Sequence, residues 1–116
     1  MEQRRRVPRQ RAGWRGVCQF GDDPRSPRYD CTVVDISIMG AGLLIYGLAN
    51  HAVVGRRLVV KIDPLDGASI TLKVTGDVRH ASATPEGAVR AGIEFSGLSD
   101  AQRSVLGALE QLQAAR

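Results

Sequence analysis

The sequence predicts a mostly β fold, a small antiparallel barrel of six strands followed by one C-terminal α-helix. Two observations predict it. Up to about residue 95, apolar residues recur mostly at every second position, which is typical of strands with one buried face. After residue 98 the spacing becomes helical. A chain of 116 residues, 43% of them hydrophobic, is long and apolar enough for one packed domain.

Six segments are predicted strands, separated by turn-forming residues. They span residues 14–20, 28–36, 41–47, 55–64, 68–80 and 88–95. The dense turn signal GDDPRSP separates the first two segments, and TPEG separates the last two. Gly76, inside the fifth segment, predicts a bulge or a sharp bend there.

The last segment, LSDAQRSVLGALEQLQAAR, predicts the helix. Ser99 is the expected N-cap, and Gln102 three residues later completes a capping box. Asp100 lies in the first turn, where a negative charge favours the helix dipole. Four apolar residues at helical spacing predict a stripe that packs on the barrel. They are Val105, Leu106, Leu109 and Leu112.

The two cysteines are predicted to be buried free thiols, because they are too few and too far apart to form a zinc site. If the first two strands pair as a hairpin, Cys18 faces Cys31 and Phe20 faces Tyr29. A cross-strand disulfide is conceivable in that register, but a reducing compartment disfavours it. We expect no metal.

The positive charge is concentrated at the N-terminus. The net charge is +4, yet residues 1–16 hold six arginines against one glutamate, which leaves the remainder nearly neutral. A duplex-binding domain would spread its cations over a face. Every basic residue in this segment is an arginine and none is a lysine. The planar guanidinium of arginine can form two parallel hydrogen bonds to a phosphate or to a base edge.

The chain is expected to be a cytoplasmic protein that does not cross a membrane. Its apolar stretches are too short to span a bilayer, and no apolar segment follows the basic start as in a secretory signal.

The sequence also predicts that the protein is not an enzyme. It contains no zinc-protease, phosphate-loop or dinucleotide-binding motif, and Ser37 lacks a nucleophile-elbow context. Neither His51 nor His80 has an obvious partner nearby in the sequence. Asp35 and Asp63 could act as acid and base, but most surface aspartates are solvated or capping. We expect no cofactor.

The stretch DISIMGAGL is the first candidate binding motif. In extended backbone, Asp35 and Ser37 point to the same side. A carboxylate accepts two N–H donors, which a guanine Watson–Crick edge offers. Gly40 and Gly42 permit positive φ and leave the backbone accessible to a ligand. A plain serine turn, with glycines for backbone geometry, is the alternative.

The arginine segment is the second candidate. Arg5 and Arg9 flank Pro8, so the segment is not a helix interior. As an extended strip it could close over a ligand held on the barrel, with its arginines on phosphate oxygens or on the guanine O6 and N7 atoms. A disordered basic tail is the alternative.

The sequence resembles the PilZ domain family through an R-x-x-x-R pair at Arg5 and Arg9 and through D-x-S-x-x-G over residues 35–40. AGIEFSGLSDAQRSVL, residues 91–106, also resembles the family's last strand and helix start, and the resemblance extends from about Arg4 to Leu112. It implies a six-stranded antiparallel barrel with a C-terminal helix, and a bacterial receptor for cyclic di-GMP rather than an enzyme.

The resemblance also assigns roles. Arg5 and Arg9 would bind phosphate and the guanine Hoogsteen edge, or stack on the base. Asp35 and Ser37 would contact the guanine edges. Gly40 would let the ligand approach the backbone.

Gly42 is a weaker candidate for the same backbone approach. Arg4 would stack on a second, intercalated nucleotide, which predicts two nucleotides per domain. The chain then divides into a flexible, arginine-rich ligand-binding segment, residues 1–11, and a barrel with its helix, residues 12–116.

The leading functional hypothesis is a stand-alone cyclic di-GMP receptor. Ordering of the arginine segment on binding would change the exposed surface. An unidentified protein partner, or dimerisation through the helix, would deliver the output. The alternatives are a nucleotide-independent adaptor of the same fold and a small-barrel nucleic-acid binder. The chain has one Trp, two Tyr and two Phe, with no stacking platform, so we expect no DNA binding.

Overall fold

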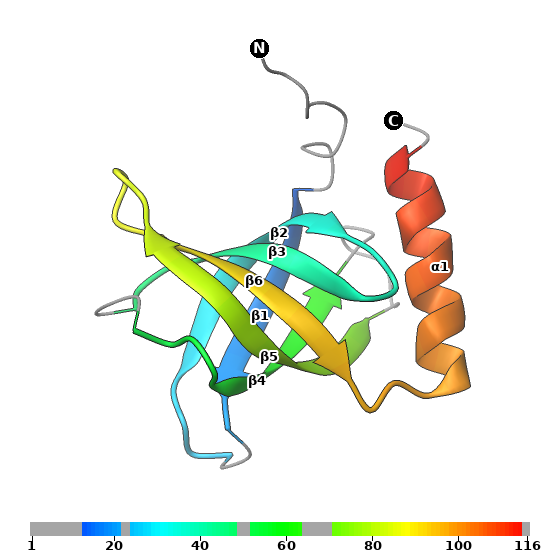
Figure 1. Ribbon diagram of the computed structural model, residues 1–116, viewed down its shortest axis with the longest axis horizontal. Coiled ribbons are helices and arrows are strands. Elements are labelled where there is room, and N and C mark those ends of the chain that lie inside the picture. The colour runs from blue at the N-terminus through cyan, green and yellow to red at the C-terminus, as the bar shows by residue number, and fades with distance from the viewer. Residues whose placement is uncertain (1–12, 22–23, 49–51, 64–70, 115–116) are drawn as a thin grey trace.

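The computed structural model describes residues 13–21, 24–48, 52–63 and 71–114. Within these ranges it contains six strands and one helix. The strands are β1 (Trp14–Phe20), β2 (Arg28–Ile36), β3 (Gly40–Ile45), β4 (Arg57–Asp63), β5 (Leu72–Ala83) and β6 (Val89–Ser96). The helix α1 spans Asp100–Ala114. The predicted mostly β fold with one C-terminal helix is confirmed (Figure 1).

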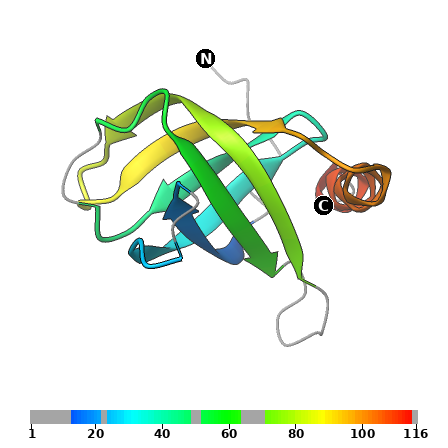
Figure 2. The same cartoon turned by 90° about the horizontal axis from the view of Figure 1, so that it is seen from below.

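The strands close into a barrel in the order β1-β2-β3-β6-β5-β4, and each neighbouring pair is antiparallel. Closure pairs every one of these strands on both sides, so none of them offers a free sheet edge. The helix lies beside the barrel rather than inside it, as the view along its axis shows (Figure 2). It is too short and too polar to span a membrane, and it is the only helix in the described part of the chain.

Alternate residues of each strand fill the barrel interior, as the period-two pattern predicts. Among the described residues, no polar or charged side chain is buried. The largest fully buried side chains come from β1 to β5 and from the helix. They are Cys18, Val33, Leu43, Ile45, Leu58, Val60, Ile62, Val74, Val78 and Leu106. Because the interior is apolar, any polar ligand has to bind on the outside of the wall.

The capping box at the start of α1 is confirmed. The Ser99 backbone N–H donates to Gln102 Oε1 over 2.7 Å, and the Gln102 N–H donates to Ser99 Oγ over 3.1 Å. Leu106 and Leu109 are buried against the barrel, and Val105 packs beside them. The prediction that Leu112 packs on the barrel is wrong, because this side chain, near the end of the helix, is 40% exposed.

Both cysteines are free and buried, as predicted, but the predicted hairpin register is wrong by two residues. Cys18 is opposite Tyr29, and Cys31 is opposite Gly16. The shift keeps every side chain on its predicted face, because the side-chain period of a strand is two. Phe20 therefore meets Tyr29 diagonally, edge to face, at 6.2 Å between ring centres. A hydrogen bond to Cys31, then burial, raises the pKa of the Cys18 thiol well above its usual value.

The strand ends differ most from prediction at β5, which begins at Leu72 and runs to Ala83 rather than ending at His80. Its last residues are polar or small and lack alternation, but they pair with β6 as far as Ala83 opposite Val89. The predicted bulge at Gly76 is also wrong. Gly76 pairs regularly with both neighbouring strands, and the irregularity lies between Val78 and His80.

Gly76 is instead required for close packing of β5 against β6. A Cβ at this position would lie 2.6 Å from the Glu94 carbonyl oxygen and 2.5 Å from Ile93 Cγ2. We expect Gly76→Ala to lower the free energy of unfolding by about 1–3 kcal/mol, as overpacking does. Urea unfolding followed by circular dichroism measures it.

Gly107 on α1 supplies the matched control, because a Cβ there meets no atom outside the helix within 4 Å. Gly107→Ala should stabilise the protein by about 1 kcal/mol through helix propensity. Equal effects of the two substitutions would contradict the packing argument.

Candidate functional site

An open groove of about 440 Å³ crosses the outside of the barrel over β2, β3, β6 and β5. It brings together four residues singled out from the sequence, Asp35, Ser37, Gly40 and Gly42, with Arg79, His80, Arg90, Gly92 and Glu94. We call it the glycine groove, after Gly42 and Gly92 at its centre. Arg4, Arg5 and Arg9 lie outside the described residues.

A single row of cross-strand neighbours makes the floor of the glycine groove. Asp35 on β2 is opposite Gly42 on β3, Gly42 is opposite Gly92 on β6, and Gly92 is opposite His80 on β5. The two middle positions have no side chain. In their place the Asp35 carboxylate lies over Gly42 and the His80 imidazole lies over Gly92, so these two polar side chains cover the middle of the row.

Each of the two glycines leaves room for the side chain of the residue opposite it on the next strand. Asp35 Oδ1 accepts a hydrogen bond from the Gly42 backbone N–H over 3.0 Å, and a Cβ at Gly42 would lie 3.1 Å from both carboxylate oxygens. A Cβ at Gly92 would collide with the imidazole of His80. A side chain at either position would displace one end of the row.

Ser37 forms the turn between β2 and β3. Its Oγ accepts hydrogen bonds from the Met39 N–H at 3.0 Å and the Gly40 N–H at 3.2 Å, and its own N–H donates to the Gly40 carbonyl at 2.9 Å. This is the serine turn that the sequence left as an alternative. The hydroxyl group is engaged in the turn, and its contact with guanine stays a prediction.

Neither Gly40 nor Gly42 adopts positive φ, so that expectation is wrong for both. Gly40 is needed for a different reason. A Cβ there would run into the Ile93 carbonyl oxygen, because the backbone of the neighbouring strand β6 lies close to this residue. Gly40 thus allows β3 to pack against β6, while Gly42 leaves room for the Asp35 carboxylate.

Charged side chains line the sides of the groove. Arg79 donates to Glu94 in a short ion pair at the surface. Arg90, also exposed, has no ion-pair partner among the described residues and lines the same groove. An anion entering the groove would thus meet an arginine whose charge no described carboxylate neutralises.

Sequence reasoning missed His80, Arg90 and Gly92 as site residues. Each faces outward on β5 or β6. Their place beside Gly42 depends on the pairing of β3 with β6 and of β6 with β5, and β3 is far from both in the chain. The outward position of Gly92 in AVRAGIEF was the one available signal, because a glycine in a strand often marks a close approach. No cluster of three or more possible metal ligands occurs in the described part of the chain.

Comparison with known proteins agrees with this architecture. The family model described as PilZ domain matches residues 3–111. The structure of the PilZ domain with c-di-GMP of YcgR from Escherichia coli is similar, with a TM-score of 0.63, 14% identity, and coverage of 87% of this chain and 82% of that one. A search of curated proteins finds no match.

The Bacillus subtilis inhibitor of motility, MotI/DgrA, is similar too, with a TM-score of 0.67 and 18% identity. The match covers 99% of this chain and 54% of that protein, so this chain corresponds to about half of it. At these identities the two structures establish the shared fold.

The bond between Asp35 and Gly42 gives a prediction on stability. Asp35→Ala leaves the buried Gly42 N–H without its acceptor, which should lower the free energy of unfolding by about 1–3 kcal/mol. Asp35→Asn keeps a carbonyl acceptor in place and should restore most of that loss. Urea unfolding of the two variants measures the difference, and equal losses would contradict the assigned bond.

Proposed function

The chain belongs to the PilZ domain family, and on that premise we propose that it is a stand-alone receptor for cyclic di-GMP. The observation that carries the proposal is the row of Asp35, Gly42, Gly92 and His80, in which the two glycines give room to the imidazole and to a carboxylate that can accept a guanine edge. The related YcgR domain was solved with c-di-GMP. The proposed role is ligand sensing rather than catalysis.

We assign the guanine Watson–Crick edge to Asp35. Its Oδ1 already accepts from Gly42, which fixes the carboxylate, and Oδ2 is the proposed acceptor for the guanine N–H groups. The purine would lie against the Asp35 carboxylate and the His80 imidazole, which cover Gly42 and Gly92. Gly40 would contribute through the fixed turn, and Ser37 would help to address the guanine edge from that turn.

The arginine segment can reach this site along the chain. Trp14, the first residue of β1, is opposite Val33 on β2, two residues before Asp35. Trp14 follows Arg9 by five positions, and five extended residue steps span about 17 Å. We propose that Arg5 and Arg9 close over the ligand phosphates and the guanine Hoogsteen edge, and that Arg4 stacks on a second nucleotide.

Arg90 is an additional proposed phosphate contact, since it lines the groove without an acidic partner in the described residues. Residues 1–11 would act as the mobile part of the receptor, and the barrel with its helix as the fixed part. The ligand itself is the only small molecule that the proposal requires. We place this receptor in the bacterial cytoplasm.

The first test is calorimetric titration with cyclic di-GMP. Wild type should bind at micromolar or lower concentration with two nucleotides per chain, and Arg9→Ala and Asp35→Ala should each weaken binding at least tenfold. Arg9→Ala should leave the melting temperature unchanged, because Arg9 lies outside the hydrophobic core in the proposal. Arg103→Ala on α1 is the control and should bind like wild type.

The outcomes separate the candidate functions. Absence of binding by wild type would favour the nucleotide-independent adaptor. Equal binding of any oligonucleotide, with a steep salt dependence, would favour the nucleic-acid binder. One nucleotide per chain would remove the role proposed for Arg4.

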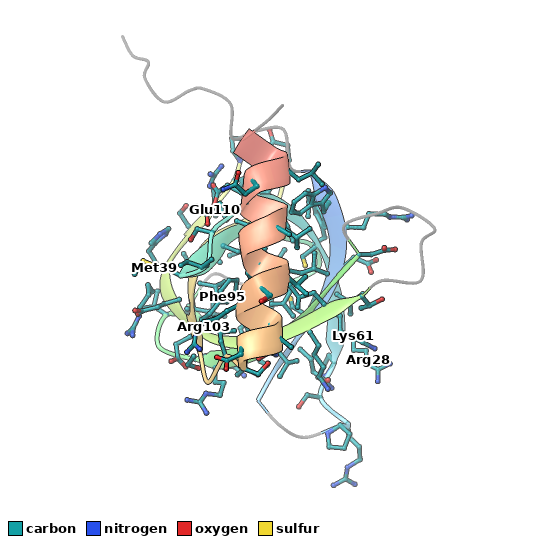
Figure 3. The ribbon with its side chains drawn as sticks, turned by 90° about the vertical axis from the view of Figure 1, so that its right-hand side faces the viewer. Arg28, Met39, Lys61, Phe95, Arg103 and Glu110 are labelled. Atoms are coloured by element: carbon teal, nitrogen blue, oxygen red, sulfur yellow. The ribbon has the colours of Figure 1, made fainter. Side chains whose placement is uncertain are left out.

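The output step is proposed to pass through α1. The Ile38 N–H in the β2–β3 turn donates to Glu110 Oε1 on α1 over 3.3 Å. Figure 3 shows Met39 and Glu110 on the same side of the helix. Ile38 and Met39 are 48% and 69% exposed, so a ligand that shifts this turn would alter an apolar surface beside the helix. A protein partner, or a second copy through the helix, would read that surface.

Removal of the contact between Glu110 and Ile38 should uncouple α1 from the β2–β3 turn. In wild type, cyclic di-GMP should shift the amide resonances of residues 37–40 and of α1. In Glu110→Ala, the turn resonances should still shift, while those of α1 should move by less than half as much. Two-dimensional NMR measures both, and unchanged α1 shifts in the variant would contradict the pathway.

A further inference from the structure

A second groove, of about 480 Å³, lies on a different face of the barrel from the glycine groove. It lies over β1, β4 and the adjoining parts of β2 and β5, and three cations line it: Arg28, Lys61 and Lys73. Figure 3 shows Arg28 and Lys61 close together on one side of α1, with Met39 on the other side. We call it the lysine groove.

The pairing of the two lysines is unusual. Lys61 on β4 and Lys73 on β5 are direct cross-strand partners, and they are the only lysines in the chain. Like charges directly opposite each other destabilise an antiparallel pair. The only two lysines of this chain therefore lie where their charges repel each other.

Carboxylates neutralise other exposed cations of the barrel and helix. Ion pairs join Arg57 to Asp77, Arg79 to Glu94 and Arg103 to Asp100. Within the described ranges, none of the three lysine-groove cations has such a partner. These three charges converge on one hollow without a described counter-charge.

The nearest acid in the same cross-strand row is Asp30 on β2. Val17 on β1 separates it from Lys61, with Asp30 opposite Val17 and Val17 opposite Lys61. Two strand spacings amount to roughly 10 Å, and no ion pair joins the two residues in the described part of the chain. Asp63 lies two residues after Lys61 on the same strand.

The floor of the lysine groove is apolar. Val17 and Val59, both half-buried, line it between the cations. Gln19 lies at the side and donates to the Ser26 carbonyl over 2.7 Å, which holds the turn after β1 in place. An apolar floor flanked by unpaired cations fits a ligand that alternates apolar and acidic groups.

We propose that the lysine groove docks a short acidic segment of a partner protein, with an apolar side chain on Val17 and Val59 and carboxylates on the three cations. Arg28 and Lys73 are three strand spacings and two residues apart, roughly 16 Å along the barrel wall, which matches about five residues of extended chain. Because the barrel is closed, the segment binds through side chains and adds no strand. Three cations over so short a span are too few to follow a duplex.

This site goes beyond the messenger-binding role and does not depend on it. The glycine groove crosses β3 and β6, and the lysine groove crosses β1 and β4, so both can be occupied at once. A receptor with both sites could hold its partner on one face and its messenger on the other.

The test is an NMR titration of the ¹⁵N-labelled full chain, without nucleotide, with the peptide acetyl-EDLDE-amide. The neutral peptide acetyl-QNLNQ-amide is the matched control. We expect the acidic peptide to shift the amides of Val17, Val59, Lys61 and Lys73. Lys61→Gln combined with Lys73→Gln should weaken binding at least tenfold, while Arg103→Gln should leave it unchanged.

The proposal is overturned if millimolar acidic peptide leaves these amides unmoved, if the neutral peptide binds equally, or if the lysine variants bind as wild type does. It is also overturned if inorganic phosphate alone reproduces the shifts at the same concentration, since the site would then take any anion. The double lysine variant should still bind cyclic di-GMP like wild type. This separates failure here from failure of the messenger site.

A second variant ensures that a loss of peptide binding cannot be explained by a loss of stability. Lys73→Glu places opposite charges on β4 and β5, so it should raise the melting temperature by relieving the repulsion with Lys61. The same variant should lose the acidic peptide. A more stable protein that still binds the peptide as tightly as wild type would contradict the assignment.

Discussion

Closure of the barrel around an apolar interior is the constraint on which the rest of the structure depends. Each strand alternates its residues between inside and outside, and no polar side chain is buried in the described part of the chain. The chemistry of this protein is therefore carried by outward-facing side chains and by exposed backbone. Function depends on which outward residues the strand register brings side by side.

The glycine and lysine grooves are two results of the same register. Across β2, β3, β6 and β5, the register aligns a carboxylate, two glycines and an imidazole in one row, and the two polar side chains lie over the glycines. Across β4 and β5, it aligns two lysines whose charges repel. The first arrangement gives a carboxylate and an imidazole room on the outside of the barrel, and the second concentrates the positive charge on which the proposed docking of an acidic segment rests. The helix joins the first groove through Glu110 and Ile38.

The sequence-based prediction succeeded where local patterns decide the outcome. Period-two alternation located five of the strands, and a short apolar run located β3. The Ser99–Gln102 box located the helix start. All these signals depend on residues close together in the chain. It failed at the register of β1 on β2 and at the bulge near Arg79, where packing of distant residues decides. The glycines were also misread, since Gly40 and Gly42 serve close approach between neighbouring groups rather than positive φ.

The sequence by itself determined the fold class, the inward face of every strand and the motif pair that marks the family. Turn chemistry and side-chain periodicity act locally, so they can be read from the chain. Only the tertiary structure decided that Gly92 and His80 extend the row that begins at Asp35, and that Lys61 opposes Lys73. Those neighbours lie on different strands, and barrel closure fixes their alignment, a constraint that no short stretch of sequence contains.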